Sequence, residues 1–300
     1  YQQKPYRRYV IETYGAEVYA SPSDRTEVGR RFLAEDPDHP GSLGVAVSEG
    51  IEAAQKSGGL KKYCLGSFLP HVLLHQTIIG EETLLQLEMA GEYPDIVIGC
   101  AGGGSNFAGF AFPFIRENLK HGKNTRIVAV EPAACPTLTK GSFTWDWADA
   151  GGVAPICQMY TLGHSFMPAS IHAGGLRYHG MAPLVSQAVV EGLMRPIAIR
   201  QNECYAAAVL FARSEGIIPA PETSHAIAGA VREANKAKEE GKEKVIVFGL
   251  SGHGMLDLSG YDAYLSGNLE DHELSEEEIQ TSTQCMDQLP KPSTANTGKW

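Results

Sequence analysis

A run of glycines followed by small polar residues is the pattern in this sequence with the clearest chemical potential. The apolar run DIVIGCA leads into Gly102, Gly103 and Gly104, and Ser105 and Asn106 follow. Glycine lets the backbone turn sharply and bring its amide groups against an anion. If a helix begins next, these amides lie at its N-terminus, which carries roughly half a positive charge. The pattern predicts a phosphate-binding site.

Two other interpretations of the glycine run stay open from the residues alone. A plain turn between a strand and a helix also uses glycine, only to relieve steric strain. The dinucleotide fingerprint needs a third glycine where Phe107 stands, and the Walker pattern lacks its lysine and hydroxyl residue. However, a second predicted strand ends in Glu131, where a dinucleotide-binding protein places an acid against a ribose. A dinucleotide therefore remains a competing ligand.

Histidine and serine motifs elsewhere offer weaker signals. His71 and His75 have a spacing that can bind a metal, but Val72 replaces the glutamate of the zinc-protease motif, so a packed or hydrogen-bonded pair is favoured. Ser251 follows a predicted strand, yet His253 stands where the nucleophile elbow of hydrolases needs glycine. At the carboxyl end of a strand, the Ser251 hydroxyl can instead hydrogen-bond a heterocyclic nitrogen in the ligand crevice of an α/β sheet.

The elements that must position these groups alternate along the chain. Apolar runs predict strands at 16–20, 63–65, 95–99, 125–130 and 244–249. Helical spacing predicts helices at 6–14, 45–57, 75–90 with a break at Gly80, after the glycine run with a kink at Pro113, at 202–213 and at 224–238. Alternation of this kind implies a doubly wound α/β fold with mostly parallel strands. The long connection through residues 132–200 is typical of a functional loop.

Composition narrows the class of protein. The formal net charge of -10 and the scattered basic residues argue against a nucleic-acid partner. Apolar runs are too short for a membrane span. The six cysteines form no CxxC pair, which disfavours structural zinc and a disulfide framework and favours a reducing, cytoplasmic location.

Five motifs together resemble the tryptophan synthase β chain in residues, order and separation. They are GGGSN at 102–106, EP at 131–132, EGIIPA at 215–220, ETSHA at 222–226 and LSGHG at 250–254. The stretch IHAGGLRYHGMAP at 171–183 points to the second, divergent branch of that family. The resemblance runs from about residue 4 to residue 275. It implies a fold-type II pyridoxal-phosphate enzyme whose N-terminal part is missing from this sequence.

The resemblance also implies an activity and roles for named residues. The family joins L-serine to indole, with loss of water, to give L-tryptophan. Carried over to this sequence, the cofactor phosphate would be held by Gly102, Gly103, Gly104, Ser105 and Asn106. Ser251 would face the pyridine nitrogen of pyridoxal 5'-phosphate, and Glu222 would lie beside the ring. A neutral serine partner leaves that nitrogen largely unprotonated.

A monovalent cation and subunit partners belong to the same resemblance. The family's cation site maps onto backbone carbonyls near Gly102, Tyr178 and Gly180. The family suggests a homodimer, and a tryptophan synthase α chain is a further candidate partner. Arg177 departs from the commoner branch, which has an acid at that position, so the contacts to the serine hydroxyl stay open.

No catalytic residue is assigned within this chain. The family's Schiff-base lysine and catalytic glutamate lie in motifs that do not occur here, and we expect both upstream of Tyr1. We accordingly expect residues 1–80 to be the remnant of an N-terminal α/β domain, residues 81–269 to form the C-terminal cofactor-phosphate-binding domain, and residues 270–300 to be an acidic, polar tail. The rival functions are a related β-eliminating enzyme, such as serine deaminase or cysteine synthase, and a non-catalytic phosphate-ligand-binding or association protein.

Overall fold

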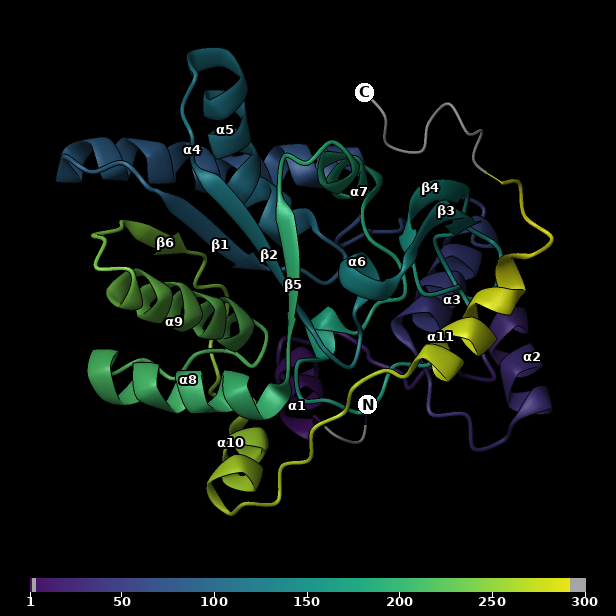
Figure 1. Cartoon of the computed structure of the whole chain (residues 1–300). Helices are drawn as coiled ribbons and strands as arrows, with labels where there is room; N and C mark the ends of the chain where they lie inside the picture. The colour runs from purple at the N-terminus through teal and green to yellow at the C-terminus, as the bar shows by residue number, and fades with distance from the viewer. Residues whose placement is uncertain (2–3, 292–300) are drawn as a thin grey trace.

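The computed structural model describes Tyr1 and residues 4–291 (Figure 1). The N-terminal third of the chain forms four helices, α1 (Pro5–Thr13), α2 (Glu27–Glu35), α3 (Leu43–Gln55) and α4 (Pro70–Ala90). Strands and helices then alternate as β1 (Ile96–Cys100), α5 (Ser105–His121), β2 (Arg126–Pro132), α6 (Thr137–Lys140), β3 (Ser142–Trp147), β4 (Ile156–Thr161), η1 (Gly174–Leu176), α7 (Pro183–Val190) and β5 (Arg195–Ile199). The remaining elements are α8 (Gln201–Glu215), α9 (Thr223–Glu239), β6 (Ile246–Phe248), α10 (Leu258–Leu265), α11 (Glu276–Thr283) and η2 (Gln284–Met286).

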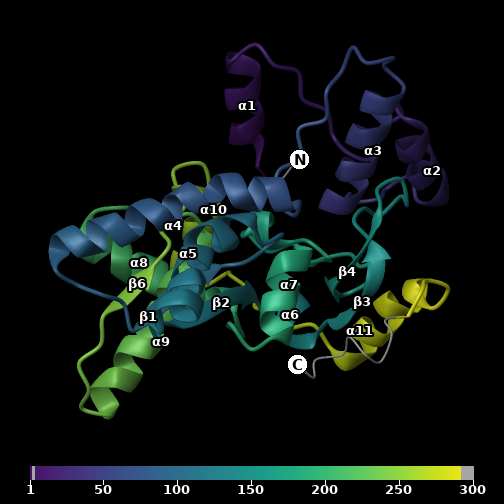
Figure 2. The ribbon, with the colours of Figure 1, turned by 90° about the horizontal axis from the view of Figure 1, so that it is seen from above.

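A parallel sheet of β5, β2, β1 and β6, in that order, forms the centre of the molecule. Helices cover both faces, with α4 and α5 on one side of the sheet and α8 and α9 on the other (Figure 1). Because β1 is buried on both faces, its sequence IVIGC is apolar throughout rather than alternating. The predicted doubly wound parallel sheet is confirmed. A separate antiparallel pair, β3 and β4, lies beside α2 and α3 (Figures 1 and 2).

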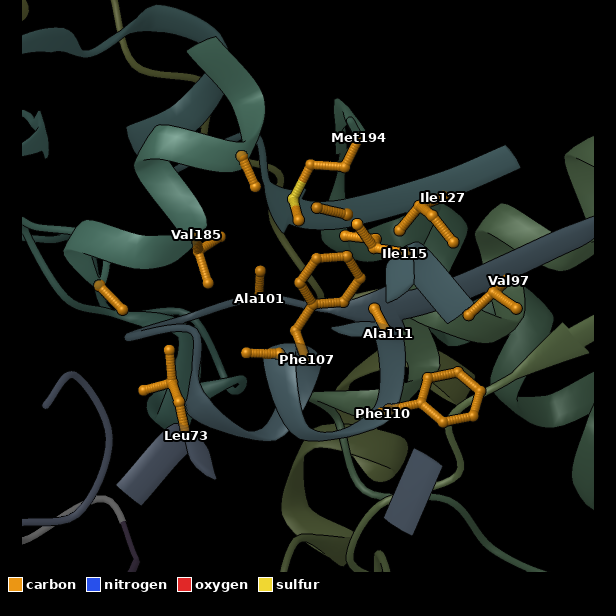
Figure 3. Packing of buried hydrophobic residues seen from close by; sticks show 14 of the residues in the cluster. Leu73, Val97, Ala101, Phe107, Phe110, Ala111, Ile115, Ile127, Val185 and Met194 are labelled. Atoms are coloured by element: carbon orange, nitrogen blue, oxygen red, sulfur yellow. The ribbon is translucent and has the colours of Figure 1, made fainter. Parts of the chain in front are cut away.

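Apolar side chains fill the space between the sheet and the helices. On the α4 and α5 side, Phe107 lies among Ala101, Ile115 and Val185 (Figure 3). On the other side, alternate residues of β1 and β2 pack against α8 and α9. Both layers fix the position of β1, and therefore of the turn that follows it.

Glycine shapes the packing of α4 against α5 rather than interrupting α4. The helix runs unbroken through Gly80, so the predicted break there is wrong. A Cβ atom at Gly80 would overlap the carbonyl oxygen of Phe110 and the ring of Pro113. Gly80 thus allows the two helices to approach closely. Pro113 lies inside α5, as predicted.

Several segments outside the central strands differ from their prediction. Residues 16–20 and 63–65 are mostly exposed and form no strand in the described chain, because no neighbouring strand lies there to pair with them. The connection 132–200 contains α6, β3, β4, η1, α7 and β5 instead of a long loop. Within the predicted tail, residues 276–283 form α11, and residues 292–300 lie outside the described residues.

The division of the chain into domains remains a proposal. Helix α4 crosses the expected boundary at residue 80 without interruption. Leu274, in the expected tail, is buried with Leu162 and Phe166. Among the described residues, no helix is both long and apolar enough to cross a membrane.

Candidate functional site

A pocket of about 390 Å³, which we call the glycine pocket, opens at the carboxyl ends of β1 and β6. This is the edge at which open α/β sheets bind ligands. The glycine run and the predicted ring-binding residues meet here, although they come from segments far apart in the sequence. The lining consists of Arg7, Ser67, Cys100, Gly102, Gly103, Gly104, Ser105, Asn106, Phe107, Gly175, Leu176, Ala220, Glu222, Ser251, Gly252, His253 and Leu256.

The glycine run turns the chain from β1 into α5 and leaves its amides available. Gly104 precedes the helix with a φ of 103°, a left-handed conformation that favours glycine. The Gly103 carbonyl accepts the Ala182 amide at 3.0 Å. Among the described residues, the amides of Gly102, Gly103 and Gly104 donate to no backbone or side-chain acceptor of the chain. These donors and the N-terminus of α5 together provide an anion-binding surface.

The space around two of these glycines excludes any side chain. A Cβ atom at Gly102 would overlap the carbonyl oxygen of Gly175. At Gly103 it would overlap the Ser67 side chain at the pocket wall. The glycines are therefore needed both for the turn and for close approach of a ligand to the backbone. A plain strain-relieving turn does not require that second property.

Ser251 lies across the pocket at the end of β6. Its amide donates to the Thr223 hydroxyl at 3.2 Å, and that hydroxyl donates to the Gly249 carbonyl at 2.6 Å. The Ser251 hydroxyl lies 4.0 Å from the Cys100 sulfur. Burial raises the pKa of the Cys100 thiol to about 12, so this sulfur is neutral at ordinary pH. Ser251 is thus held by its backbone while its hydroxyl stays available to a ligand.

Glu222 joins the pocket to η1. Its carboxylate accepts the Gly175 amide at 2.8 Å, which holds the 174–176 turn against the pocket. Ser251 and Glu222 both line the same cavity as the glycine run, as their predicted ring-binding roles require. Their chemical roles remain predictions.

The pocket fits a phosphorylated heterocycle in shape and in donor set. Free amides and a helix N-terminus suit a phosphate group, and a neutral hydroxyl suits a ring nitrogen. No lysine lines the pocket in the described part of the chain.

The residues proposed for the monovalent cation are divided between the pocket and its surroundings. Gly102 lines the pocket, whereas Tyr178 and Gly180 lie on the segment between η1 and α7. The Tyr178 carbonyl accepts the Thr137 hydroxyl at 3.2 Å, and Gly180 pairs with Thr161 of β4. Among the described residues, no group of three or more His, Cys, Asp or Glu side chains is arranged to hold a metal.

Glu131, the acid that supported the dinucleotide interpretation, makes structural hydrogen bonds instead. It is buried at the end of β2, and its oxygens accept the Leu138 amide and the Thr139 amide, each at 2.8 Å. Burial raises its pKa to about 7 despite these bonds. Glu131 therefore anchors the start of α6 and does not face the pocket, which removes the main support for a dinucleotide ligand.

Other predicted groups lie elsewhere. His71 and His75 are both exposed on α4, so the prediction that they pack is wrong, and no hydrogen bond joins them in the described part of the chain. Arg177 lies outside the glycine pocket and lines a separate hollow near the N-terminus of the chain.

Sequence reasoning missed Arg7, Ser67 and Leu176 as pocket residues. Arg7 reaches the pocket from α1. Its guanidinium forms a bidentate salt bridge with Asp257, in which the two nitrogens lie 2.8 and 2.9 Å from the two carboxylate oxygens. No local pattern marks such a residue, because its partner lies 250 positions away. His253, by contrast, belongs to the LSGHG motif and was recognisable from it.

Comparisons with known sequences agree with the pocket. A family model for pyridoxal-phosphate dependent enzymes matches residues 2–252. Tryptophan synthase beta chain 2 of Aeropyrum pernix is 57% identical over 276 residues, which cover 92% of this chain and 62% of that protein. The protein of the same name from Thermotoga maritima is 58% identical over 261 residues, covering 87% of this chain and 61% of that protein. The chain thus spans about three fifths of the length of these curated relatives.

Comparison with solved structures supports the fold. O-acetyl serine sulfhydrylase isoform 3 from Entamoeba histolytica superposes with a TM-score of 0.56 at 16% identity, covering 92% of this chain and 66% of that one. At this identity the likeness concerns the fold alone. The predicted fold-type II α/β architecture is confirmed.

Proposed function

The chain belongs to the family of pyridoxal-phosphate-dependent enzymes, as its motifs predicted, and from this we propose that it forms the cofactor-binding part of an enzyme joining L-serine to indole. The product would be L-tryptophan, with release of water. The observation that carries the proposal is the convergence of free glycine amides, Ser251 and Glu222 on one pocket. The high identity to tryptophan synthase beta chains favours these substrates over others.

Each pocket group has a distinct task in this proposal. The amides of Gly102 to Gly104 and the first turn of α5 would bind the phosphate of pyridoxal 5'-phosphate. The Ser251 hydroxyl would hydrogen-bond the ring nitrogen, and because a hydroxyl is neutral it would leave that nitrogen largely unprotonated. Glu222 would set the ring's position while holding η1 through Gly175. Bound pyridoxal 5'-phosphate supplies an electron sink for charge developing on the amino-acid substrate.

The proposal extends to a cation, to partners and to location. A monovalent cation would be held by backbone carbonyls near Gly102, Tyr178 and Gly180. A homodimer is the proposed assembly, with a tryptophan synthase α chain as a further partner. A cytoplasmic location is supported by the six free cysteines.

Protein purified from its native source provides the test. In the presence of added pyridoxal 5'-phosphate, we expect tryptophan to form from L-serine and indole, measured by chromatography. Its intact mass, compared with the 32.3 kDa of these residues, shows whether additional residues accompany the chain. A Ser251→Ala variant should bind the cofactor but form tryptophan more slowly, because the ring nitrogen loses its partner.

The rival functions give different products in the same assay. Pyruvate from L-serine without indole would indicate a serine deaminase, and cysteine from O-acetylserine and sulfide would indicate a cysteine synthase. Tight binding of pyridoxal 5'-phosphate with none of these products would favour a non-catalytic binding protein. Any of these three outcomes would contradict the proposal.

A further inference from the structure

A cysteine, a histidine and an aspartate meet where the C-terminal helix packs against the turn after β4. The sulfur of Cys285, in η2, lies 3.5 Å from Nδ1 of His164. The same Nδ1 lies 2.5 Å from a carboxylate oxygen of Asp146, in β3. None of these residues lines the glycine pocket. The cluster is therefore separate from the proposed cofactor site.

Asp146 fixes the hydrogen on the histidine ring. Its side chain is fully buried, and its two oxygens also accept the Trp147 amide at 2.8 Å and the Thr161 hydroxyl at 2.6 Å. Since a carboxylate only accepts hydrogen bonds, Nδ1 must carry the hydrogen. The Cys285 sulfur is then a second acceptor for that hydrogen. In its neutral form the Cys285 thiol donates to the Ser282 carbonyl at 3.1 Å, and loss of that hydrogen leaves a thiolate that accepts from Nδ1 of His164.

The charges around the cluster favour the same state. Burial by itself would lower the pKa of His164, but Asp146 and Cys285 outweigh it and raise that pKa to about 10. Burial would likewise raise the pKa of Cys285, but His164 and the hydroxyl and amide of Ser165 outweigh it, so that pKa is lowered. His179, the other histidine near His164, is buried and its pKa is lowered, which keeps it neutral.

The remaining cysteines lack this environment. Burial raises the pKa of the thiols of Cys100, Cys135, Cys157 and Cys204. Cys64 is exposed, whereas Cys285 is partly buried. Exposure and thiolate formation therefore favour different cysteines, which allows the two effects to be separated by experiment.

We propose that Cys285 is a modification site whose thiolate, held by His164 and Asp146, exchanges with small disulfides such as oxidised glutathione. The Cys285 sulfur attacks one sulfur of the disulfide, a new bond forms between these two sulfurs, and the disulfide's own sulfur–sulfur bond breaks. The second half leaves as a thiolate, which takes a proton from solvent. The disulfide is the oxidant: its departing sulfur is reduced to a thiolate while the Cys285 sulfur is oxidised, so no other oxidant is needed. A thiol reductant reverses the reaction.

The modification would loosen the C-terminal helix. Gly163 has a φ of 95°, and a Cβ atom placed there would lie 3.1 Å from the Cys285 sulfur and overlap the Ser282 carbonyl. The Ser282 hydroxyl donates to the Leu162 carbonyl at 2.6 Å. A group attached to the sulfur would add bulk beside the Gly163 turn and these contacts. We therefore expect α11 and η2 to separate from the turn when Cys285 is modified.

The test compares Cys285 with Cys64 in the same molecule. The protein is exposed to excess oxidised glutathione at neutral pH, quenched at intervals and digested, and each mixed disulfide is quantified by mass spectrometry. We expect Cys285 to react ~10-fold faster than the more exposed Cys64. In a His164→Gln variant we expect Cys285 to slow by ~10-fold while Cys64 keeps its rate. A Cys285→Ser variant confirms the assignment of the peptide.

The pH dependence of the wild-type reaction rate tests whether Cys285 is a thiolate even if His164→Gln fails to fold. The rate at Cys285 should remain nearly constant between pH ~7 and ~9, the range in which an ordinary cysteine thiol in solution ionises. Faster reaction at Cys64, a Cys285 rate that rises steeply across this pH range, or an unchanged Cys285 rate in folded His164→Gln would overturn the proposal. These readouts do not require cofactor or tryptophan formation, so they are independent of the proposed function.

Discussion

The parallel-sheet body and the periphery of the molecule are stabilised by different means. The parallel-sheet body consists of β1, β2, β5 and β6 with the helices α4, α5, α7, α8 and α9, and apolar clusters fill both faces of its sheet. The periphery consists of α2, α3, β3, β4 and α11. There, buried carboxylates make many of the contacts. Glu49 accepts three serine and threonine hydroxyls, and Asp149 accepts the Ser48 hydroxyl at 2.5 Å.

This difference decides what each region can do. In the body, side chains pack and the backbone binds the ligand, so the glycine amides form a surface that does not depend on pH. In the periphery, polar side chains from distant segments meet, and their charges respond to pH and to chemical modification. The proposed phosphate site and the proposed Cys285 site follow these two patterns.

The largest expected effect comes from placing a side chain in the backbone site of the body. A Gly103→Val variant should weaken binding of pyridoxal 5'-phosphate by about 100-fold, or about 2.8 kcal/mol, because a Cβ atom overlaps Ser67 and blocks the amides. Titration followed by cofactor absorbance measures this. Affinity for pyridoxal, which lacks the phosphate, should change much less.

A glycine just outside the pocket provides the matched control. A Cβ atom at Gly174 would lie no closer than 3.6 Å to any neighbouring atom, so Gly174→Ala should bind normally. Unchanged affinity in Gly103→Val would contradict the phosphate assignment, and equal weakening for pyridoxal and its phosphate would indicate a general loss of the pocket.

The body was the part of the molecule most readily predicted from sequence. The apolar run of β1, the glycine run and the helix after it are adjacent in the chain, so a local pattern contains the whole unit. Gly80 shows the limit of such reasoning. Its sequence context indicates a helix break, but its role is to admit Phe110 and Pro113 from α5, a contact that only the packed structure reveals.

The periphery was largely unpredictable for the same physical reason. Ser48 and Asp149 are 101 positions apart, and His164 and Cys285 are 121 apart, so neither pair forms a motif. The strand predicted at 16–20 failed because β propensity needs a partner strand, and none lies beside it. The same limit applies within the body: Glu131 of β2 was predicted to face a ligand because its structural partners, Leu138 and Thr139, gave no signal in the sequence.

Removing a buried charge from the periphery should have the next largest effect. In Glu49→Gln an NH2 group, which donates hydrogen bonds, replaces a carboxylate oxygen, which accepts them. We expect the free energy of unfolding of α2 and α3 to fall by about 2 kcal/mol. Ser23 and Thr26, which donate to Glu49 at 2.6 and 2.7 Å, would lose their acceptor or meet another donor. Hydrogen exchange measured by mass spectrometry should be faster in α2 and α3 of the variant than in the wild type, whereas exchange in β1 should not change.

An exposed glutamate on α4 serves as the comparison. Glu88→Gln should leave exchange in α2 and α3 unchanged, because Glu88 is exposed. Slower or unaltered exchange in Glu49→Gln would show that the hydroxyl contacts do not stabilise the periphery.

A smaller effect concerns stability at low pH, where we expect the periphery to be destabilised through Glu52. Burial would raise the pKa of Glu52, but the Val28 and Glu27 amides and Lys56 outweigh it and lower that pKa from 4.5 to about 2. The stabilisation is therefore complete above pH 4.5 and is lost as the pH falls towards 2. Because Lys56 is exposed and solvent screens it, we expect a loss of about 1.5 kcal/mol.

Tryptophan fluorescence can follow this loss in the periphery. Trp145 and Trp147 lie in β3, and a Trp300→Phe background removes the remaining tryptophan. The pH-dependent decrease in stability between 4.5 and 2 should be smaller in Glu52→Gln, because Glu49 and Glu278, whose pKa values are also lowered, still contribute. Identical profiles for this variant and the wild type would assign the pH dependence to other groups.

The smallest expected effect concerns the helix that carries the proposed modification site. Ser275 accepts the Glu278 amide at 3.2 Å, and the Glu278 carboxylate accepts the Ser275 amide at 2.8 Å, which together cap the start of α11. Ser275→Ala should cost about 1 kcal/mol and speed hydrogen exchange in α11 by about 5-fold. Ser214→Ala, which removes an exposed hydroxyl within α8, should leave α11 unaffected. If α11 opens independently of the body, exchange in β1 stays constant in Ser275→Ala. Equal acceleration in β1 would mean that α11 opens only when the whole chain unfolds, and the two regions would then be one cooperative unit.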